Sequence, residues 1–180
     1  MIIPANSQAV LLCEQLTTFI FDFDGVLTDN YVYVAENGDE LVRCYRGDSL
    51  ALNALKRIDK RLFILSTEEN PVVESRAGKL QINCISGVTN KAYELERLAA
   101  DNDFDLLRTC YVGNDLNDLR AMLKCGVKVC PADSHPEIKS ISEFVLKSRG
   151  GHGVVRELVE VVMGLDLVKI LYSEGVQKEC

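Results

Sequence analysis

Polar groups suited to phosphoryl chemistry follow short apolar runs at four places along the chain. Asp22 and Asp24 end the first run, and Ser66 follows the second. Lys91 opens a helical pattern after the third run, and the fourth run leads into residues 113–118, which read G-N-D-L-N-D. Each residue is common in turns and helix caps when taken alone. Their order and their shared placement at the ends of apolar runs favour a common site.

The D-x-D-G pattern at residues 22–25 has two interpretations. Asp22 and Asp24 point the same way if the extended backbone continues through both, because strand side chains alternate between faces. Two like charges held together require a cation, a shared proton or open water. An exposed turn is the other interpretation, since Asp hydrogen-bonds its own backbone and Gly25 permits a sharp turn. The other segments must decide between the two.

Together, these residues can transfer a phosphoryl group through an aspartyl-phosphate. Asp22 would attack phosphorus, while Asp24 would protonate the leaving alkoxide and then activate water. Ser66 would donate a hydrogen bond to the phosphoryl oxygens, and Lys91 would balance their charge. Hard oxygen ligands without His or Cys favour Mg²⁺ as the cation.

Strand and helix patterns alternate along the chain and would position these groups. The first expected strand begins at Thr18. The others cover residues 62–65, 82–85, 109–112, 127–130 and 144–146. Near-continuous apolar strands that alternate with helices predict an α/β fold, a Rossmann-like doubly wound parallel sheet with helices on both faces. Ligands bind beyond the carboxyl ends of such strands, where all four polar groups fall.

Several local signals predict the remaining elements. Asn37-Gly38 between residues 31–34 and 41–45 predicts a β-hairpin directly after the first strand. Asp48 is expected to be the N-cap of a helix, Pro71 the first residue of another, and Asn90 the N-cap of a third that begins at Lys91. We expect further helices up to Gly126 and over 154–163. Residues 1–17 are expected to be irregular or briefly helical, and 165–180 to form a tail.

Composition limits the class of protein. The 180 residues, 47% of them hydrophobic, fit one domain covering 1–180, and no apolar stretch is long enough to cross a bilayer, so we expect a cytoplasmic protein without a membrane partner. The net charge of −7 argues against nucleic acid as a partner. Seven cysteines without a C-x-x-C pair indicate reduced thiols.

The sequence resembles the haloacid dehalogenase superfamily phosphatases over nearly its whole length. F-D-F-D-G-V-L-T-D matches the first family motif, Ser66 the second, Lys91 the third and G-N-D-L-N-D the fourth. The resemblance implies that Asp22 is the nucleophile and that Asp24 is the acid and base. It also implies that Asp24 gives its backbone carbonyl to Mg²⁺ and that the fourth motif completes the metal site.

Motif spacing points to a branch of that superfamily. Family members usually insert a cap domain between the first and second motifs or between the second and third, and these intervals are too short here for a cap. The hairpin and the terminal R-G-G-x-G-V-V-R-E resemble the 3-deoxy-D-manno-octulosonate 8-phosphate phosphatase group, which includes nonulosonate 9-phosphate phosphatases and domains appended to acylneuraminate cytidylyltransferases. That resemblance implies a homotetramer in which neighbouring subunits cover the site, and a phosphorylated sugar acid as substrate.

The substrate-binding residues are implied by the same resemblance. The octulosonate enzymes typically read S-G-R at the second motif, whereas this chain reads Ser66-Thr67-Glu68, as in the nonulosonate branch. Thr67 and Glu68 are therefore expected to contact the sugar. The other expected contacts are Arg76 and Lys79 downstream and, toward the phosphate or carboxylate, Arg149, Gly150 and Gly151.

The fourth motif departs from the usual G-D-D-x-x-D, because Asn114 stands where the family has its metal-binding Asp. An amide oxygen can coordinate Mg²⁺ but brings no charge. The expected metal ligands are thus Asp22, Asp24, Asn114 and Asp115. Retained activity is the favoured interpretation, and the alternative is a weak or silent tetramerisation domain.

Two other classes fit less well. A signalling receiver domain also uses Asp, Ser or Thr, and Lys in that order, but its phosphoacceptor lies on a middle strand and lacks D-x-D-G. A calcium-binding EF-hand loop would require Gly at Leu27 and Glu at Tyr33.

Overall fold

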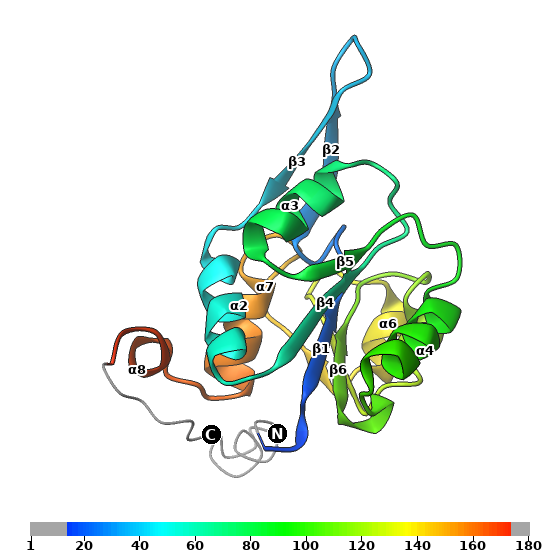
Figure 1. The fold of residues 1–180 in the computed structure, drawn as a ribbon. Coiled ribbons are helices and arrows are strands. Elements are labelled where there is room, and N and C mark those ends of the chain that lie inside the picture. Colours follow the sequence, from blue (N-terminus) through cyan, green and yellow to red (C-terminus); the bar gives the residue numbers. More distant parts are fainter. Residues whose placement is uncertain (1–13, 174–180) are drawn as a thin grey trace.

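A six-stranded parallel sheet forms the centre of the protein (Figure 1). The structure, a computed structural model, describes residues 14–173. The strand order is β5-β4-β1-β6-β7-β8, with every neighbouring pair parallel. The strands are β1 (Thr18–Phe21), β4 (Arg61–Leu65), β5 (Asn83–Ile85), β6 (Thr109–Val112), β7 (Val127–Cys130) and β8 (Phe144–Val145). The prediction of a doubly wound α/β fold is confirmed.

Helices cover both faces of the sheet because the central strand is apolar on both sides. Phe19 and Phe21 join one buried cluster and Ile20 joins the other. The first cluster includes side chains of α2 (Gly47–Arg57), α3 (Val72–Leu80) and α7 (Val154–Glu157). The second includes side chains of α4 (Lys91–Asn102), α5 (Leu119–Met122) and α6 (Pro136–Ile141). The other short helical segments are η1 (Leu106–Arg108), η2 (Leu158–Val162) and α8 (Leu167–Tyr172).

The predicted hairpin is present and stands clear of the sheet (Figure 1). Its strands are β2 (Thr28–Val34) and β3 (Glu40–Cys44), paired antiparallel. Gly38 has a φ of 87°, which fits the turn expected at Asn37-Gly38. Between β1 and β4 the described chain forms only this hairpin and α2, and between β4 and β5 only α3. No cap domain is inserted at either place.

Two predictions about helix starts need correction, and one is confirmed. Asp48 does not cap its own helix, because α2 already begins at Gly47; its Oδ1 instead accepts a hydrogen bond from Arg156 N at the start of α7, 2.9 Å away. The helix predicted from Pro71 begins one residue later, at Val72. Asn90 caps α4 as predicted, since its side chain accepts from Tyr93 N.

The chain ends differ partly from expectation. Residues 167–172 of the predicted tail form α8, where Asp166 accepts hydrogen bonds from Val168 N and Lys169 N. The helix expected up to Gly126 is shorter, because α5 ends at Met122. Residues 1–13 of the lead-in predicted for 1–17, and the tail beyond 173, lie outside the described residues. None of the helices within 14–173 has the length and apolar character needed to cross a membrane.

Candidate active site

The carboxyl ends of three adjacent strands bring the predicted polar groups together. Strand β1 lies between β4 and β6, and Asp22, Ser66 and Asn114 come just after these strands. Asp22 N still donates to Val112 O at 2.9 Å, so sheet pairing fixes the start of the loop. The groups open onto a cavity of about 260 Å³ that is lined by Asp22, Asp24, Asn30, Ser66, Thr67, Asn114, Asp115 and Asn117.

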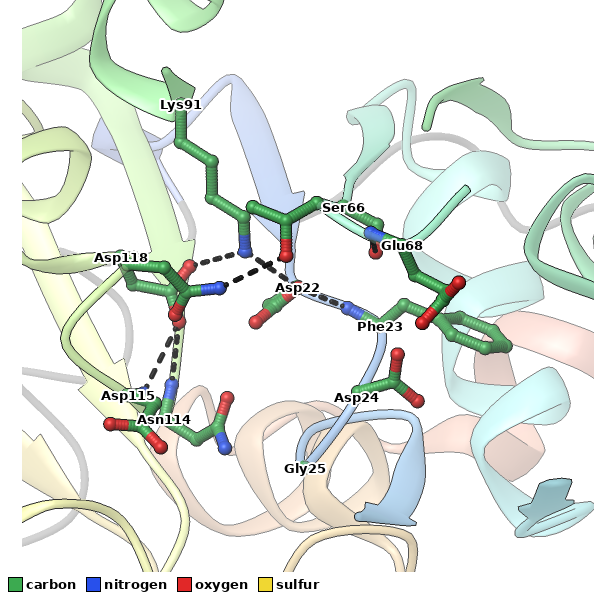
Figure 2. A network of polar contacts seen from close by, with 12 residues as sticks. Asp22, Phe23, Asp24, Gly25, Ser66, Glu68, Lys91, Asn114, Asp115 and Asp118 are labelled. Carbon is green, nitrogen blue, oxygen red and sulfur yellow. Dashed lines mark hydrogen bonds and ion pairs between the residues drawn. The ribbon is translucent and has the colours of Figure 1, made fainter. Parts of the chain in front are cut away.

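Lys91 lies at the centre of a buried ionic cluster behind this cavity (Figure 2). Its Nζ is 2.7 Å from Asp22 Oδ1 and 2.7 Å from Asp118 Oδ1, and all three side chains are at most 5% exposed. Asp118 also accepts hydrogen bonds from Tyr111 Oη and Asn114 N. Because Phe23 N donates to the same Asp22 oxygen that faces Lys91, the orientation of the Asp22 carboxylate is fixed.

Burial and ion pairing act together on the charge state of this cluster. Burial raises the pKa of Asp22, the Asp118 carboxylate adds to that rise, and Lys91 opposes it. Burial lowers the pKa of Lys91, but Asp22 and Asp118 outweigh it, so the pKa of Lys91 is raised and the ammonium stays charged. Two carboxylates thus share one lysine. A further cation beside Asp22 would balance the remaining negative charge.

Asp24 is suited to holding a proton. Its side chain is half-buried and accepts a hydrogen bond from Thr28 Oγ1 at 3.0 Å. Burial raises the pKa of Asp24, the Thr28 hydrogen bond lowers it, and the Glu68 carboxylate raises it further. A carboxyl with a raised pKa is the type of group that can donate a proton to a leaving group near neutral pH.

Asn114 lies against the loop that carries both aspartates. With its amide nitrogen turned toward them, it donates to Asp22 Oδ2 at 3.2 Å and to Asp24 O at 2.9 Å. With its amide oxygen there instead, three acceptor oxygens converge, as a hard divalent cation requires. A Cβ at Gly25, whose φ is +77°, would overlap the Asn114 amide, so Gly25 permits this close approach.

These oxygens fit Mg²⁺ although they differ from a carboxylate cage. No group of three Asp, Glu, His or Cys side chains within residues 14–173 is arranged to hold a metal. The converging donors are instead one carboxylate, one backbone carbonyl and one amide. Asp115 is exposed at the rim of the same cavity, and its Oδ1 accepts from Leu116 N.

Two of the predicted sugar-binding residues lie at the site. Thr67 lines the first cavity and accepts a hydrogen bond from Asn117 Nδ2. Glu68 lines an adjoining cavity, and its backbone N donates to Ser66 Oγ. Arg76 instead donates to Ser49 Oγ, and the side chain of Lys79 is exposed on α3. Neither basic residue lines these two cavities, and their role in binding stays a prediction.

The glycine-rich segment before α7 lies behind the catalytic loop. A Cβ at Gly150 would overlap Gly25 O, and Gly151 N donates to Val26 O at 3.0 Å. Arg149 is exposed and its Nε pairs with Asp133 at 3.2 Å. Within one chain, these residues support the loop and do not line either cavity. Their proposed contact with substrate remains a prediction.

Sequence reasoning missed several residues of the site. Asp118 was not among the predicted site residues, yet it positions Lys91; its place at the end of G-N-D-L-N-D was the available signal. Thr28, the penultimate residue of the first motif, donates a hydrogen bond to Asp24. Asn30 and Asn117 also line the first cavity; Asn117 lies within G-N-D-L-N-D, whereas nothing in the local sequence pattern marks Asn30.

Comparison with known proteins identifies the class that this fold and site define. Residues 47–158 match the family model of haloacid dehalogenase-like hydrolases, and the chain belongs to this family. It is 30% identical over 165 residues to the 3-deoxy-D-manno-octulosonate 8-phosphate phosphatase KdsC of Escherichia coli K12, covering 89% of this chain and 86% of that protein. The chain is therefore a phosphatase of the haloacid dehalogenase-like family.

Solved structures of phosphatases are also similar to this chain. The 3-deoxy-D-manno-octulosonate 8-phosphate phosphatase from Moraxella catarrhalis, in complex with magnesium ion, phosphate ion and KDO, superposes with a TM-score of 0.82 at 27% identity over 92% of each chain. The cobalt-bound deoxy-D-mannose-octulosonate 8-phosphate phosphatase from Haemophilus influenzae has a TM-score of 0.80 at 28% identity, covering 85% of this chain and 90% of that one. Phosphatases of this family use a divalent metal.

Proposed function

We propose that the protein is a Mg²⁺-dependent phosphomonoesterase that acts on a sugar-acid phosphate of the 3-deoxy-octulosonate 8-phosphate or nonulosonate 9-phosphate type. The observation that carries this proposal is the convergence of Asp22, Asp24 and Ser66 on one cavity, with Lys91 paired to Asp22 behind it. The names of the relatives support the substrate class. Glu68 after Ser66 favours the nonulosonate type.

The first step would transfer the phosphoryl group to the protein. A carboxylate oxygen of Asp22 attacks phosphorus while the bond from phosphorus to the ester oxygen breaks. Asp24 gives its proton to that oxygen, and the sugar leaves as an alcohol. Lys91 and the Phe23 N–H hold the Asp22 carboxylate in place for this attack.

The second step would release phosphate. Asp24, now ionised, takes a proton from water, whose oxygen attacks the phosphorus of the aspartyl-phosphate. The bond from phosphorus to Asp22 breaks, so inorganic phosphate leaves and both aspartates return to their starting states. Ser66 Oγ, buried at the cavity wall, is placed to donate to a phosphoryl oxygen.

Asp22, the Asp24 carbonyl and Asn114 would hold Mg²⁺, with Asp115 at the rim. Bound there, the ion supplies charge stabilisation for the transferred phosphoryl oxygens. The net negative charge of the Asp22, Lys91 and Asp118 cluster supports a cation at this position.

We also propose a cytoplasmic homotetramer. The hairpin presents a row of large apolar side chains that are 63–70% exposed, namely Tyr31, Tyr33, Val34 and Leu41. Apolar patches of this kind mark association surfaces. A tetramer would also allow Arg149 of a neighbouring subunit to reach the site. Light scattering tests the assembly, and a monomer at micromolar concentration would contradict it.

A catalytically weak or silent tetramerisation domain, related to those appended to acylneuraminate cytidylyltransferases, is the second candidate. It is favoured by Asn114, whose amide can satisfy Asp22 and Asp24 O without a cation. The intact set of Asp22, Asp24, Ser66 and Lys91 favours the enzyme.

Phosphate release from a panel of sugar phosphates, with and without Mg²⁺, separates these functions. We expect Mg²⁺-dependent turnover that falls on the order of 10³-fold or more in Asp22→Asn. Asp101→Asn, on the exposed surface of α4, is the matched control and should retain activity. A folded tetramer that turns over no substrate would favour the silent domain, and stable phosphate retained on the protein would indicate a receiver.

A further inference from the structure

Tyr111 is a buried tyrosine whose hydroxyl reaches the ionic cluster behind the catalytic cavity. It lies on β6 and is fully buried, whereas the five other tyrosines of the chain are 46–70% exposed. Its Oη donates to Asp118 Oδ1 at 3.0 Å. Since a buried hydroxyl is costly unless it is hydrogen-bonded, this bond to Asp118 is what makes a tyrosine acceptable inside the strand.

Asp118 receives hydrogen-bond donors on both of its carboxylate oxygens. Oδ1 accepts from Tyr111 Oη and from Lys91 Nζ, which is 2.7 Å away. Oδ2 accepts from Asn114 N at 2.9 Å. Burial raises the pKa of Tyr111, and the carboxylates of Asp118 and Asp22 raise it further, so the hydroxyl stays protonated and acts as a donor. Tyr111 therefore shares one oxygen of Asp118 with the lysine.

Lys91 is divided between two carboxylates, and Figure 2 shows its ammonium between them. Its Nζ is 2.7 Å from Asp118 Oδ1 and 2.7 Å from Asp22 Oδ1. Because both carboxylates are buried away from water, they compete for the same ammonium. The hydrogen bond from Tyr111 withdraws negative charge from the Asp118 oxygen and so weakens its attraction for Lys91. Without that bond the ammonium would shift toward Asp118 and away from Asp22.

We propose that Tyr111 is a positioning residue for the reaction, because its hydrogen bond to Asp118 keeps Lys91 against the nucleophile. The inference rests on the proposed function, in which Asp22 attacks phosphorus. Tyr111 does not line the catalytic cavity, so it acts only through Asp118 and Lys91. Loss of its hydroxyl should therefore slow the attack by Asp22 and leave substrate binding almost unchanged.

Tyr111→Phe tests this, because it removes the hydroxyl and keeps the ring. Single-turnover hydrolysis of p-nitrophenyl phosphate, with the protein in excess and Mg²⁺ saturating, follows the attack by Asp22, and the leaving group of this ester needs no proton from Asp24. The rate constant should fall by roughly tenfold to a hundredfold, the usual effect of a small misplacement of reacting groups. The protein concentration that gives the half-maximal rate should change by less than about twofold.

Thr109→Val is the matched control, since it also removes a buried hydroxyl from β6. Thr109 Oγ1 donates to Asp105 O at 2.8 Å, outside the ionic cluster. Both variants should lower the melting temperature, whereas only Tyr111→Phe should slow the reaction. Equal rate constants in the two variants, with circular dichroism showing folded protein, would overturn the inference and leave Tyr111 a purely structural residue.

Asp118→Asn tests the route through Asp118. This change removes the competing charge, so adding Tyr111→Phe to it should lower the rate constant by less than about a further twofold. If the double variant instead shows the full loss seen in Tyr111→Phe alone, the route through Asp118 is wrong. A wild type that turns over neither this ester nor any sugar phosphate would contradict the proposed function, and the inference with it.

Discussion

Lys91 Nζ lies 2.7 Å from Asp22 Oδ1, and both side chains are almost completely buried. Lys91 opens α4, whereas Asp22 follows β1, so the contact joins elements about 70 residues apart in the sequence. The lysine fixes the proposed nucleophile and balances its charge. Asp118 holds the same ammonium from the opposite side, so the orientation of Asp22 depends on an ionic cluster and not on local backbone alone.

Loss of Lys91 should affect stability as well as turnover. In Lys91→Met the buried carboxylates lose their cation, and breaking such a buried pair costs about 3–5 kcal/mol of unfolding free energy. Urea unfolding measures this. Lys124→Met is the control, because Lys124 pairs with Glu96 at 2.6 Å on the surface and should change stability by less than about 1 kcal/mol. Equal losses of unfolding free energy in Lys91→Met and Lys124→Met would contradict a stabilising role for the buried cluster.

Asn114→Asp should strengthen the dependence on Mg²⁺. The new carboxylate would face Asp22 and Asp24 O without a donor, so the metal-free protein should melt at a lower temperature and gain more from added Mg²⁺. Thermal scans across a Mg²⁺ titration measure both effects. Asn117→Asp adds the same charge at the exposed cavity wall and should shift them less. An unchanged apparent Mg²⁺ affinity in Asn114→Asp would remove Asn114 from the metal site.

Asp48 should make stability fall as pH rises. Burial raises its pKa from 3.8 to about 6, although Arg156 N and Val155 N hydrogen bonds oppose this. Its Oδ2 is buried without a partner among the described residues. Between pH 4 and 6 the folded state therefore binds more protons than the unfolded state, and stability declines through that window.

Asp48→Asn removes this titration. The unfolding free energy of the wild type minus that of the variant should decrease by up to about 3 kcal/mol from pH 4 to pH 7. Denaturant unfolding at several pH values measures the difference. The exposed Asp101→Asn change provides the baseline. A difference that rises with pH would show that the hydrogen bonds to α7 outweigh burial.

Glycine at position 150 should be required for the catalytic loop. In Gly150→Ala the new methyl group would overlap the backbone of Gly25, so we expect lower stability and lower activity together. Gly78→Ala is the matched control, since nothing lies within 4 Å of its Cβ position in α3. That change should stabilise the protein by roughly 0.5–1 kcal/mol. Thermal unfolding of both variants checks the contrast, and a stable, active Gly150→Ala protein would contradict it.

The sequence by itself determined the strands, most helices and the hairpin, because these depend on local periodicity, turn residues and caps. It also placed Asp22, Ser66 and Lys91 beside the strand ends, since parallel strands present their carboxyl ends at one edge. Their roles follow from side-chain chemistry together with that order. The start of α4 after Asn90 was also predictable, because an Asn side chain is a local N-cap signal.

Only the tertiary structure decided which distant groups meet. The sequence around Asp48 predicts a helix N-cap. Because α2 packs against α7, however, the Asp48 carboxylate accepts a hydrogen bond from Arg156 N. Asp118 meets Lys91, and the hairpin carries Glu40 to Asn70, through contacts between segments separated by about 30 residues. Such partners depend on how the sheet and helices pack, and no local pattern of residues encodes that packing.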